Sequence, residues 1–366
     1  MASNNVYRAL RITNSVSAFC AFNPVSIRSF TCSAAFMKHG AVPAFKPSSS
    51  PELDDLLAIV RRKVFLPYHL SKKERNLIFK DTKSTGIDLE KEPQWVSIEG
   101  ERFRLEHVDV TKDVPRHWTV ILQTLEACKT KEDYENLTTL LIGLKETGYE
   151  LKAKRSIKLI ARLAKAKRLD LVLELARRES ATGFGFSDIA TTNMWLKTIQ
   201  RQAIRADWKP EPTKQGLVWL EMFNDLSQEP TRKWTVRPEI IYSVLLEFAA
   251  TQVTNHALED TEGKIRTYAE KLLAAHPSTQ DLDSIRNLKN SSCNELLEEY
   301  VTMLHACKLA LPILSTNASI AKPLEAKISE LEVAVEHLMK PLKEEREGFT
   351  WDGVELHQTL LGSSTS

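Results

Sequence analysis

Apolar side chains recur every three or four positions along most of this chain, which is the spacing of amphipathic helices. Beyond Arg116 the pattern contains almost no strand signal, and Gly and Pro separate successive helical segments. Helices paired in this way predict an all-α dominated fold, an α-solenoid whose helical hairpins stack over residues 113–320. The clearest apolar stripes lie in residues 131–147, 151–165, 168–178, 240–248, 265–273 and 296–304.

Residues 52–112 follow a different pattern and predict a small α+β segment before the array. Helical spacing predicts a helix over Glu52–Lys63, a break marked by Pro67 and the polar run of residues 71–75, and a second short helix ending at Phe79. Between residues 94 and 110, apolar and polar residues alternate around a Glu-Gly pair, which predicts a β-hairpin with one buried face. The segment forms either a separate domain or a cap on the array.

The C-terminal part predicts one long helix over residues 321–347, followed by a tail over residues 348–366. Leu331, Val335 and Leu338 belong to an apolar series in this helix, at alternate spacings of four and three. The series is too short to establish a coiled coil. It serves either as a cap on the array or as a face that docks a partner helix.

The N-terminal composition predicts a mitochondrial presequence over residues 1–37. The first fifty-one residues contain no Asp or Glu and are rich in Ser and Thr. Arg28, Phe30 and Ser33 have a spacing that resembles a two-step processing pattern, and we expect the mature protein in the mitochondrial matrix. The alternative is a disordered basic arm. Residues 38–51 contain prolines and serines without periodicity and predict a flexible linker.

The composition excludes a membrane-spanning protein and a largely disordered one. Hydrophobic residues make up 42% and charged residues 27% of the chain, so a large core can form. No apolar run approaches the length of a transmembrane helix. Peripheral association with the inner membrane stays open.

No motif for catalysis or metal binding stands out. Cys128, Cys293 and Cys307 are isolated and predict buried thiols in a reducing compartment. The histidines lack ligand spacing, and no nucleophile elbow or Walker sequence occurs. Gly183 and Gly185 follow a predicted helix rather than a strand, so we interpret them as a turn. We expect no metal, no cofactor and no enzymatic activity.

One motif occurs twice. Thr147–Leu151 and Thr182–Phe186 both read Thr-Gly-aromatic-x-apolar, start 35 residues apart and enclose one helix–turn–helix unit. A period of this length that ends in Gly and an apolar residue resembles the pentatricopeptide repeat family, over about residues 116–186. The resemblance implies a right-handed superhelical array that reads single-stranded RNA through the first helix of each pair.

The regular period ends with the second copy of this motif, so at most two repeats are regular. A degenerate array of this kind also fits recognition of a protein, or of ribosomal RNA by its shape. The related tetratricopeptide class has a similar period, binds peptides and stays an alternative.

The strongest local feature is a basic stripe on the helix predicted over residues 151–165. Residues 152–178 carry a net charge of +8, whereas the whole chain carries +2. The cations within the helix cover about a quarter of its circumference, opposite its apolar face. A phosphate backbone fits such a stripe, and the alternative is an ordinary solvated helix face. The candidate nucleic-acid-binding residues are Lys152, Lys154, Arg155, Lys158, Arg162 and Lys165.

Four tryptophans make residues 187–238 rich in aromatic side chains. Trp195, Trp208, Trp219 and Trp234 could stack with bases, but packing within the core and between repeats explains them more simply.

Together these patterns predict a non-catalytic matrix protein of the helical-repeat class. It binds RNA or a ribonucleoprotein in mitochondrial gene expression, in translation or in transcript maturation. The alternative is a scaffold or assembly factor for the mitochondrial ribosome or a respiratory-chain complex. That protein would hold a polypeptide on the concave surface of the array or on the C-terminal helix.

Overall fold

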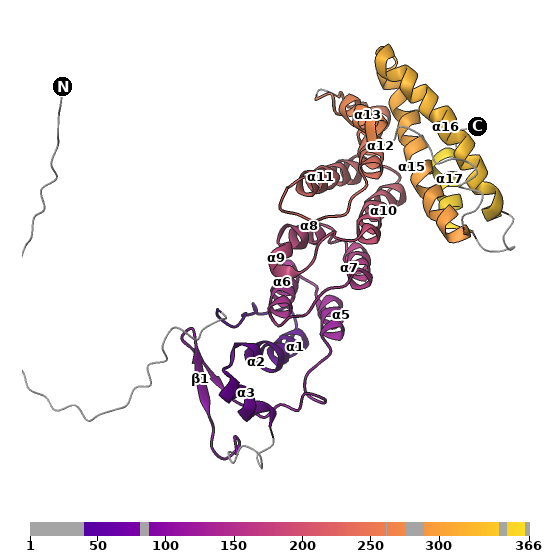
Figure 1. The fold of residues 1–366 in the computed structure, drawn as a ribbon. Helices are drawn as coiled ribbons and strands as arrows, with labels where there is room; N and C mark the ends of the chain where they lie inside the picture. The colour runs from indigo at the N-terminus through magenta and orange to yellow at the C-terminus, as the bar shows by residue number, and fades with distance from the viewer. Residues whose placement is uncertain (1–39, 81–87, 261, 276–288, 344–349, 363–366) are drawn as a thin grey trace, which may run out of the picture. The chain divides into compact units, whose positions relative to one another are not determined.

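Helices form most of the structure (Figure 1). The computed structural model describes residues 40–80, 88–260, 262–275, 289–343 and 350–362. The predicted processing residues Arg28, Phe30 and Ser33 lie outside the described residues. Within the described residues the fold is mostly helical with one two-stranded sheet, as the hydrophobic pattern predicts.

The N-terminal segment places short helices beside the sheet. Its elements are α1 (Pro51–Val60), η2 (Arg61–Phe65), α2 (Leu66–His69), α3 (Lys72–Phe79), β1 (Trp95–Ile98) and β2 (Glu101–Arg104). The predicted break is present, but it lies at Leu70 and Ser71 rather than at Pro67, because the chain stays helical up to His69. The η2 segment is a π-helical turn in which the Leu66 amide donates to the Arg61 carbonyl, five residues back. This wider turn accommodates the proline ring.

The predicted β-hairpin is confirmed. β1 and β2 are antiparallel, with Trp95 opposite Arg104 at the open end. Glu99 and Gly100 form the turn with φ of 47° and 85°, and positive φ at both positions is what a type I′ turn requires. The strands are shorter than the predicted range of residues 94–110.

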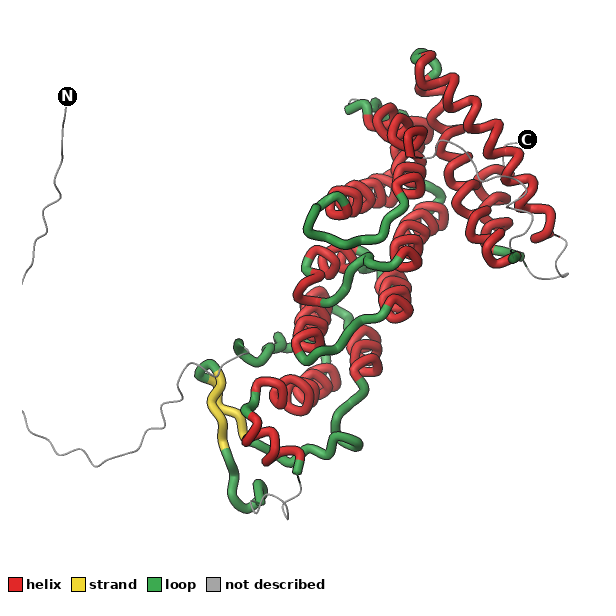
Figure 2. The backbone as a smooth tube through the Cα atoms, in the orientation of Figure 1, coloured by secondary structure: helices red, strands yellow, loops and turns green. Residues whose placement is uncertain are grey.

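Two columns of helices follow the N-terminal segment (Figure 2). One column contains α5 (His117–Ala127), α7 (Ala153–Lys165) and α10 (Ile189–Arg205). The other contains α6 (Lys131–Glu146), α8 (Asp170–Arg177), α9 (Glu179–Thr182) and α11 (Pro210–Ser227). α7 contacts α10, α6 contacts α9 and α8 contacts α11, so successive hairpins pack on one another. Leu137, Leu163 and Trp195 are fully buried in the core between them.

The two repeated motifs are helix-terminating turns. Gly148 and Gly183 have φ of 87° and 68°, a region that glycine adopts at little cost. After α6, the Tyr149 amide donates to the Leu144 carbonyl and the Gly148 amide donates to the Lys145 carbonyl, both at 3.0 Å. This pair of bonds is the Schellman motif, and it ends α6 so that the chain turns into α7.

The C-terminal part consists of long helices around α15 (Asn290–Leu314). The others are α12 (Pro238–His256), α13 (Lys264–Ala275), α16 (Ala318–Lys343) and α17 (Asp352–Leu361). α15 contacts α12, α16 and α17. The predicted tail over residues 348–366 is wrong for the residues that form α17, where Val354 is buried. No described helix combines the length and apolar character that crossing a membrane demands.

Residues 41–50 have no helix or strand, yet they are fastened to α6. The Asn136 side chain exchanges two hydrogen bonds of 2.8 Å with the Lys46 backbone. Asp133 accepts hydrogen bonds from the Ser49 amide at 2.8 Å and the Ser49 hydroxyl at 2.6 Å. The flexible linker predicted from composition is therefore a fixed part of the folded unit from residue 41 onward.

Candidate nucleic-acid interface

The basic stripe lies on the solvent-facing side of α7. The opposite side packs against α8 and α10, and Leu159, Ile160 and Leu163 are completely buried there. The helical spacing therefore separates an apolar face from a charged one, as predicted. The exposed basic residues are Lys152, Lys154, Lys158, Arg162 and Lys165.

The lysines of this stripe have no ion-pair partner in the described part of the chain. No carboxylate oxygen of a described residue lies within 4.0 Å of the ammonium groups of Lys152, Lys154, Lys158 and Lys165. Their positive charge is therefore available to an external anion.

Arg162 of the stripe has one acidic partner. Its guanidinium donates to the Glu126 carboxylate of α5 at 3.2 Å. The two side chains are 47% and 60% exposed, and surface pairs of this kind contribute little to stability. An external anion can therefore compete for Arg162.

Arg155 is half-buried and belongs to a different feature from the open stripe. Its guanidinium donates to the Tyr149 hydroxyl at 2.8 Å. It also lies over the rings of Tyr149 and Trp118, at 5.4 and 5.9 Å from their centroids. The prediction that Arg155 shares the exposed stripe is wrong, because this aromatic pair holds its side chain at the stripe's edge.

A hollow lies where the N-terminal ends of α5 and α7 meet, and we call it the Trp118 hollow. Its volume is about 500 Å³. His117 packs edge-on against Tyr149, with ring centroids 5.2 Å apart. Burial and the nearby Arg155 charge lower the pKa of His117, so its imidazole is neutral at pH 7. The hollow is lined by Pro115, Arg116, His117, Trp118, Thr119, Tyr149 and Arg155.

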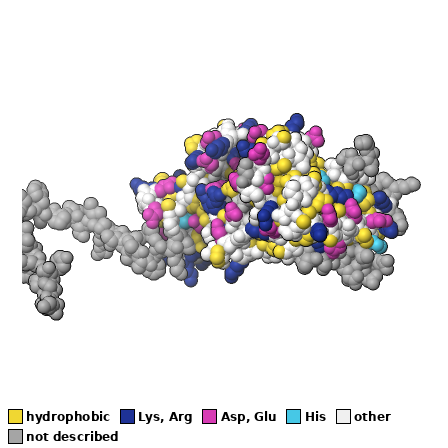
Figure 3. Space-filling model, turned by 90° about the horizontal axis from the view of Figure 1, so that it is seen from above, with side chains coloured by type: hydrophobic (Ala, Val, Ile, Leu, Met, Phe, Trp, Pro, Cys, Tyr) yellow, Lys and Arg dark blue, Asp and Glu magenta, His cyan; other side chains and the backbone are white. Residues whose placement is uncertain are grey.

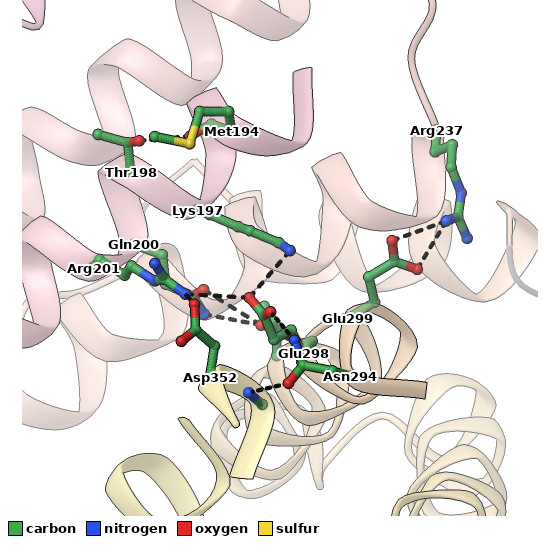
Figure 4. A network of polar contacts seen from close by, with 12 residues as sticks. Met194, Lys197, Thr198, Gln200, Arg201, Arg237, Asn294, Glu298, Glu299 and Asp352 are labelled. Carbon is green, nitrogen blue, oxygen red and sulfur yellow. Dashed lines mark hydrogen bonds and ion pairs between the residues drawn. The ribbon is translucent and has the colours of Figure 1, made fainter. Parts of the chain in front are cut away.

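α10 also carries basic side chains, and two of them, Lys197 and Arg201, are paired. Figure 4 shows Lys197 and Arg201 of α10 directed at Glu298 of α15, at N–O distances of 3.1 and 3.5 Å. Arg201 also contacts Asp352 of α17 at 2.6 Å. Glu298 is only 6% exposed, so these cations compensate a buried carboxylate. They are not available to a nucleic acid.

Positive charge on the molecule is local. On the face drawn in Figure 3, Lys and Arg are interspersed with Asp and Glu and form no broad basic field. The whole-chain net charge of +2 agrees with this distribution. Any contact with nucleic acid therefore depends on particular sites such as the stripe and the Trp118 hollow.

The tryptophans of residues 187–238 belong to the core. Trp195 is fully buried and Trp234 is 9% exposed, while Trp208 and Trp219 are partly buried against the core. The Phe186 ring lies 4.9 Å from the Trp234 ring, centroid to centroid, in an edge-on contact. Packing, rather than stacking with bases, accounts for this aromatic cluster.

The three cysteines among the described residues are inert thiols. Cys128, Cys293 and Cys307 are buried, as their isolation in the sequence predicts. Burial raises the pKa of both Cys128 and Cys307 to about 12, so these thiols stay protonated. Within the described ranges, no three His, Cys, Asp or Glu side chains come together as a metal site would need.

The Trp118 hollow was not predicted from the sequence. In the sequence, Arg116 and Trp118 lie only at the expected start of the helical array. Tyr149 is the aromatic residue of the first motif copy. The difference between the two motif copies is a usable signal. The second copy has Phe184, which is fully buried and has no hydroxyl to hold an arginine.

Comparisons with known proteins identify similar proteins of the mitochondrial ribosome. The profile of a family described as "Mitochondrial ribosomal protein mS27" matches residues 28–358. The chain is also similar to a small ribosomal subunit protein mS27 from Neurospora crassa. The two are 26% identical over 281 residues, which is 77% of this chain and 70% of the relative. The profile match includes the stripe, the Trp118 hollow and the first part of α17, up to residue 358.

Proposed function

Because this chain belongs to the mitochondrial ribosomal protein mS27 family, we propose that it binds ribosomal RNA as a component of the small mitochondrial ribosomal subunit. It is a structural protein of the mitochondrial matrix and works in translation without catalysis. The scaffold alternative in a respiratory-chain complex loses its support, because the family assembles with the ribosome.

The observation that carries the RNA proposal is the unpaired charge on α7. Lys154, Lys158 and Lys165 face solvent on one side of α7, and exposed Lys152 immediately precedes the helix; none has an acidic partner among the described residues. A folded protein gains little from such a cluster, because the charges repel one another. An RNA backbone would neutralise them and release counterions.

The repeat architecture supports the same proposal. α7 is the first helix of the pair between the two glycine turns, and first helices face the RNA in the pentatricopeptide family that this segment resembles. The hairpins stack in two columns, and both repeat glycines have positive φ. We propose a degenerate pentatricopeptide-like solenoid that recognises RNA mainly through its backbone.

A charge reversal tests the proposal. Replacing Lys152, Lys154, Lys158 and Lys165 by Glu should abolish binding of the purified protein to transcribed small-subunit ribosomal RNA. It should also move the protein from the small subunit to the top of a sucrose gradient. A matched control reverses four exposed cations of the N-terminal segment, at Lys72, Lys73, Arg75 and Lys80. Equal binding by both variants and the wild type would contradict the proposal.

We also propose that residues 1–37 are removed on import, at the position indicated by Arg28, Phe30 and Ser33. Mass spectrometry of the N-terminal peptide from purified mitochondria checks this. A mature N-terminus near Lys38 is expected. An intact Met1 or Ala2 in the matrix protein would show that the basic arm is retained.

A further inference from the structure

The Trp118 hollow combines an aromatic surface with positive charge. Aromatic rings from the start of α5 and from the turn before α7 form one wall. Arginines from both helices flank it, and no acidic residue belongs to its lining. The hollow is open to solvent, and its volume of about 500 Å³ is comparable to that of small-ligand sites.

The arginine inside the hollow is held ready for an anion. Tyr149 accepts a hydrogen bond from Arg155, and two rings support its guanidinium, which fixes the side chain before any ligand arrives. No carboxylate oxygen of a described residue lies within 4.0 Å of Arg155 or Arg116. A fixed, unpaired guanidinium loses little conformational freedom on binding phosphate.

The hollow lies at one end of the basic stripe. Lys152 immediately precedes α7, and Arg155 belongs to its first turn, so the stripe begins beside the hollow. The exposed lysines extend from there to Lys165, a span of roughly 20 Å at helical rise. A phosphate backbone that follows the stripe therefore reaches the hollow at the N-terminal end of α7.

We propose that the Trp118 hollow receives one unpaired nucleotide of ribosomal RNA. Its base packs against the aromatic wall of His117 and Trp118, and its phosphate lies between Arg116 and Arg155. This inference rests on the proposed function and adds a single-stranded element to it. Bases in a duplex are stacked on their neighbours and cannot enter such a hollow, whereas a bulged or loop nucleotide can.

An acidic peptide is the other ligand class with suitable charge, and the observations favour RNA. Lys154, Lys158 and Lys165 repeat along one face of α7 beside the hollow, which matches a uniformly charged backbone better than a single carboxylate. The aromatic wall adds a stacking surface that every base can use.

The test separates stacking from charge. The probe is transcribed small-subunit ribosomal RNA, and affinity is measured over a series of salt concentrations. Trp118→Leu removes the aromatic surface without removing a charge. We expect roughly tenfold weaker binding with an unchanged slope of log affinity against log salt. Arg116→Gln, at an exposed position before α5, should weaken binding and also reduce the slope by about 0.7.

Trp95→Leu is the matched control. Trp95 is 56% exposed on β1, and Arg102 lies over its ring at 5.5 Å, so it offers a similar Trp–Arg pair far from the stripe in the sequence. Its affinity should equal that of the wild type. Thermal unfolding of each variant shows whether a loss of binding reflects a loss of fold, and in that case the Arg116→Gln result decides.

The outcomes distinguish this inference from the function it rests on. Wild-type affinity of both hollow variants, together with loss of binding in the four-lysine reversal, would overturn the nucleotide site and leave the RNA function. Retained binding in the reversal as well would overturn both. In intact ribosomes, ultraviolet crosslinks should join RNA to the peptide that contains Trp118. A ribosomal protein crosslinked there instead would identify a peptide ligand and overturn the proposal.

Discussion

The neighbouring helices α7 and α10 contain similar basic side chains in opposite circumstances. Lys154 and Lys158 on α7 face solvent without an acidic partner among the described residues. Lys197 and Arg201 on α10 hold a buried carboxylate, Glu298, that belongs to a helix almost a hundred residues away. The number of cations on a helix thus says little about RNA binding. Their availability to RNA depends on whether they already pair with a carboxylate of the same protein.

The largest effect on stability should come from removing Glu298, the carboxylate that pairs with the cations of α10. Glu298→Ala leaves Lys197 and Arg201 without their shared partner and should lower the free energy of unfolding by about 3 kcal/mol. Urea denaturation measures this change. Glu336→Ala removes a 76% exposed carboxylate and should cost less than about 0.5 kcal/mol. Equal losses in the two variants would refute the structural role assigned to Glu298.

A smaller effect should follow at Asp133, another carboxylate with internal partners. It accepts hydrogen bonds from Ser49 and from the amides of Lys129 and Thr130. Asp133→Asn should destabilise the protein by about 2 kcal/mol at pH 7. Glu132→Gln, at an exposed position in the same helical turn, is the neutralisation control.

The effect of Asp133 should also depend on pH. Burial raises the pKa of Asp133, but the hydrogen bonds from Ser49 and the two amides outweigh it and lower the pKa in the folded state. A lowered folded-state pKa means that the ionised carboxylate stabilises the fold above the unfolded value of about 4. That contribution is lost as the pH falls below it. The gap between wild type and Asp133→Asn should therefore narrow in acid, as urea titrations from pH 7 to 3 would show.

The four unpaired lysines should matter for RNA binding rather than for stability. Replacing Lys152, Lys154, Lys158 and Lys165 by Gln should change the free energy of unfolding by less than about 0.5 kcal/mol. The slope of log RNA affinity against log salt should nevertheless fall by about three, because four phosphate contacts disappear. A marked loss of stability without a change in the slope would mean that these lysines serve the fold.

The smallest effect is expected at the one acidic residue beside the stripe. Glu126→Gln frees Arg162 and should strengthen RNA binding by roughly twofold to fivefold, since an exposed ion pair is weak. The measurement is again affinity against salt, with Gln123→Ala as a neutral control one turn earlier on α5. Weaker RNA binding would show that Glu126 orients Arg162 rather than competing for it.

Local sequence patterns predicted the features that depend on neighbouring residues. The apolar period of α7 correctly separated buried Leu159 and Leu163 from exposed Lys158. The shared Thr-Gly-aromatic motif located two helix ends, since glycine at positive φ is a local requirement. The Glu-Gly pair similarly placed the hairpin turn.

Features that depend on distant partners were missed. Lys197 and Arg201 share the partner Glu298, which lies about a hundred residues further along the chain. No local sequence pattern predicts this pairing. Arg155 appears on a helical wheel as part of the stripe, but Tyr149 draws it aside. Residues 41–50 have a linker's composition and are fixed only because α6 presents Asp133 and Asn136 to them.

The position of α17 has a consequence for how the protein matures. Gly353 donates its amide to the Asn294 side chain at 2.8 Å, and a Cβ there would lie 3.1 Å from the Asn294 carbonyl oxygen. Arg201 meets Asp352 across 151 residues. A matrix protein enters its compartment N-terminus first, so these contacts form last. Until residues 352 and 353 have entered, the face of α15 that α17 covers stays exposed.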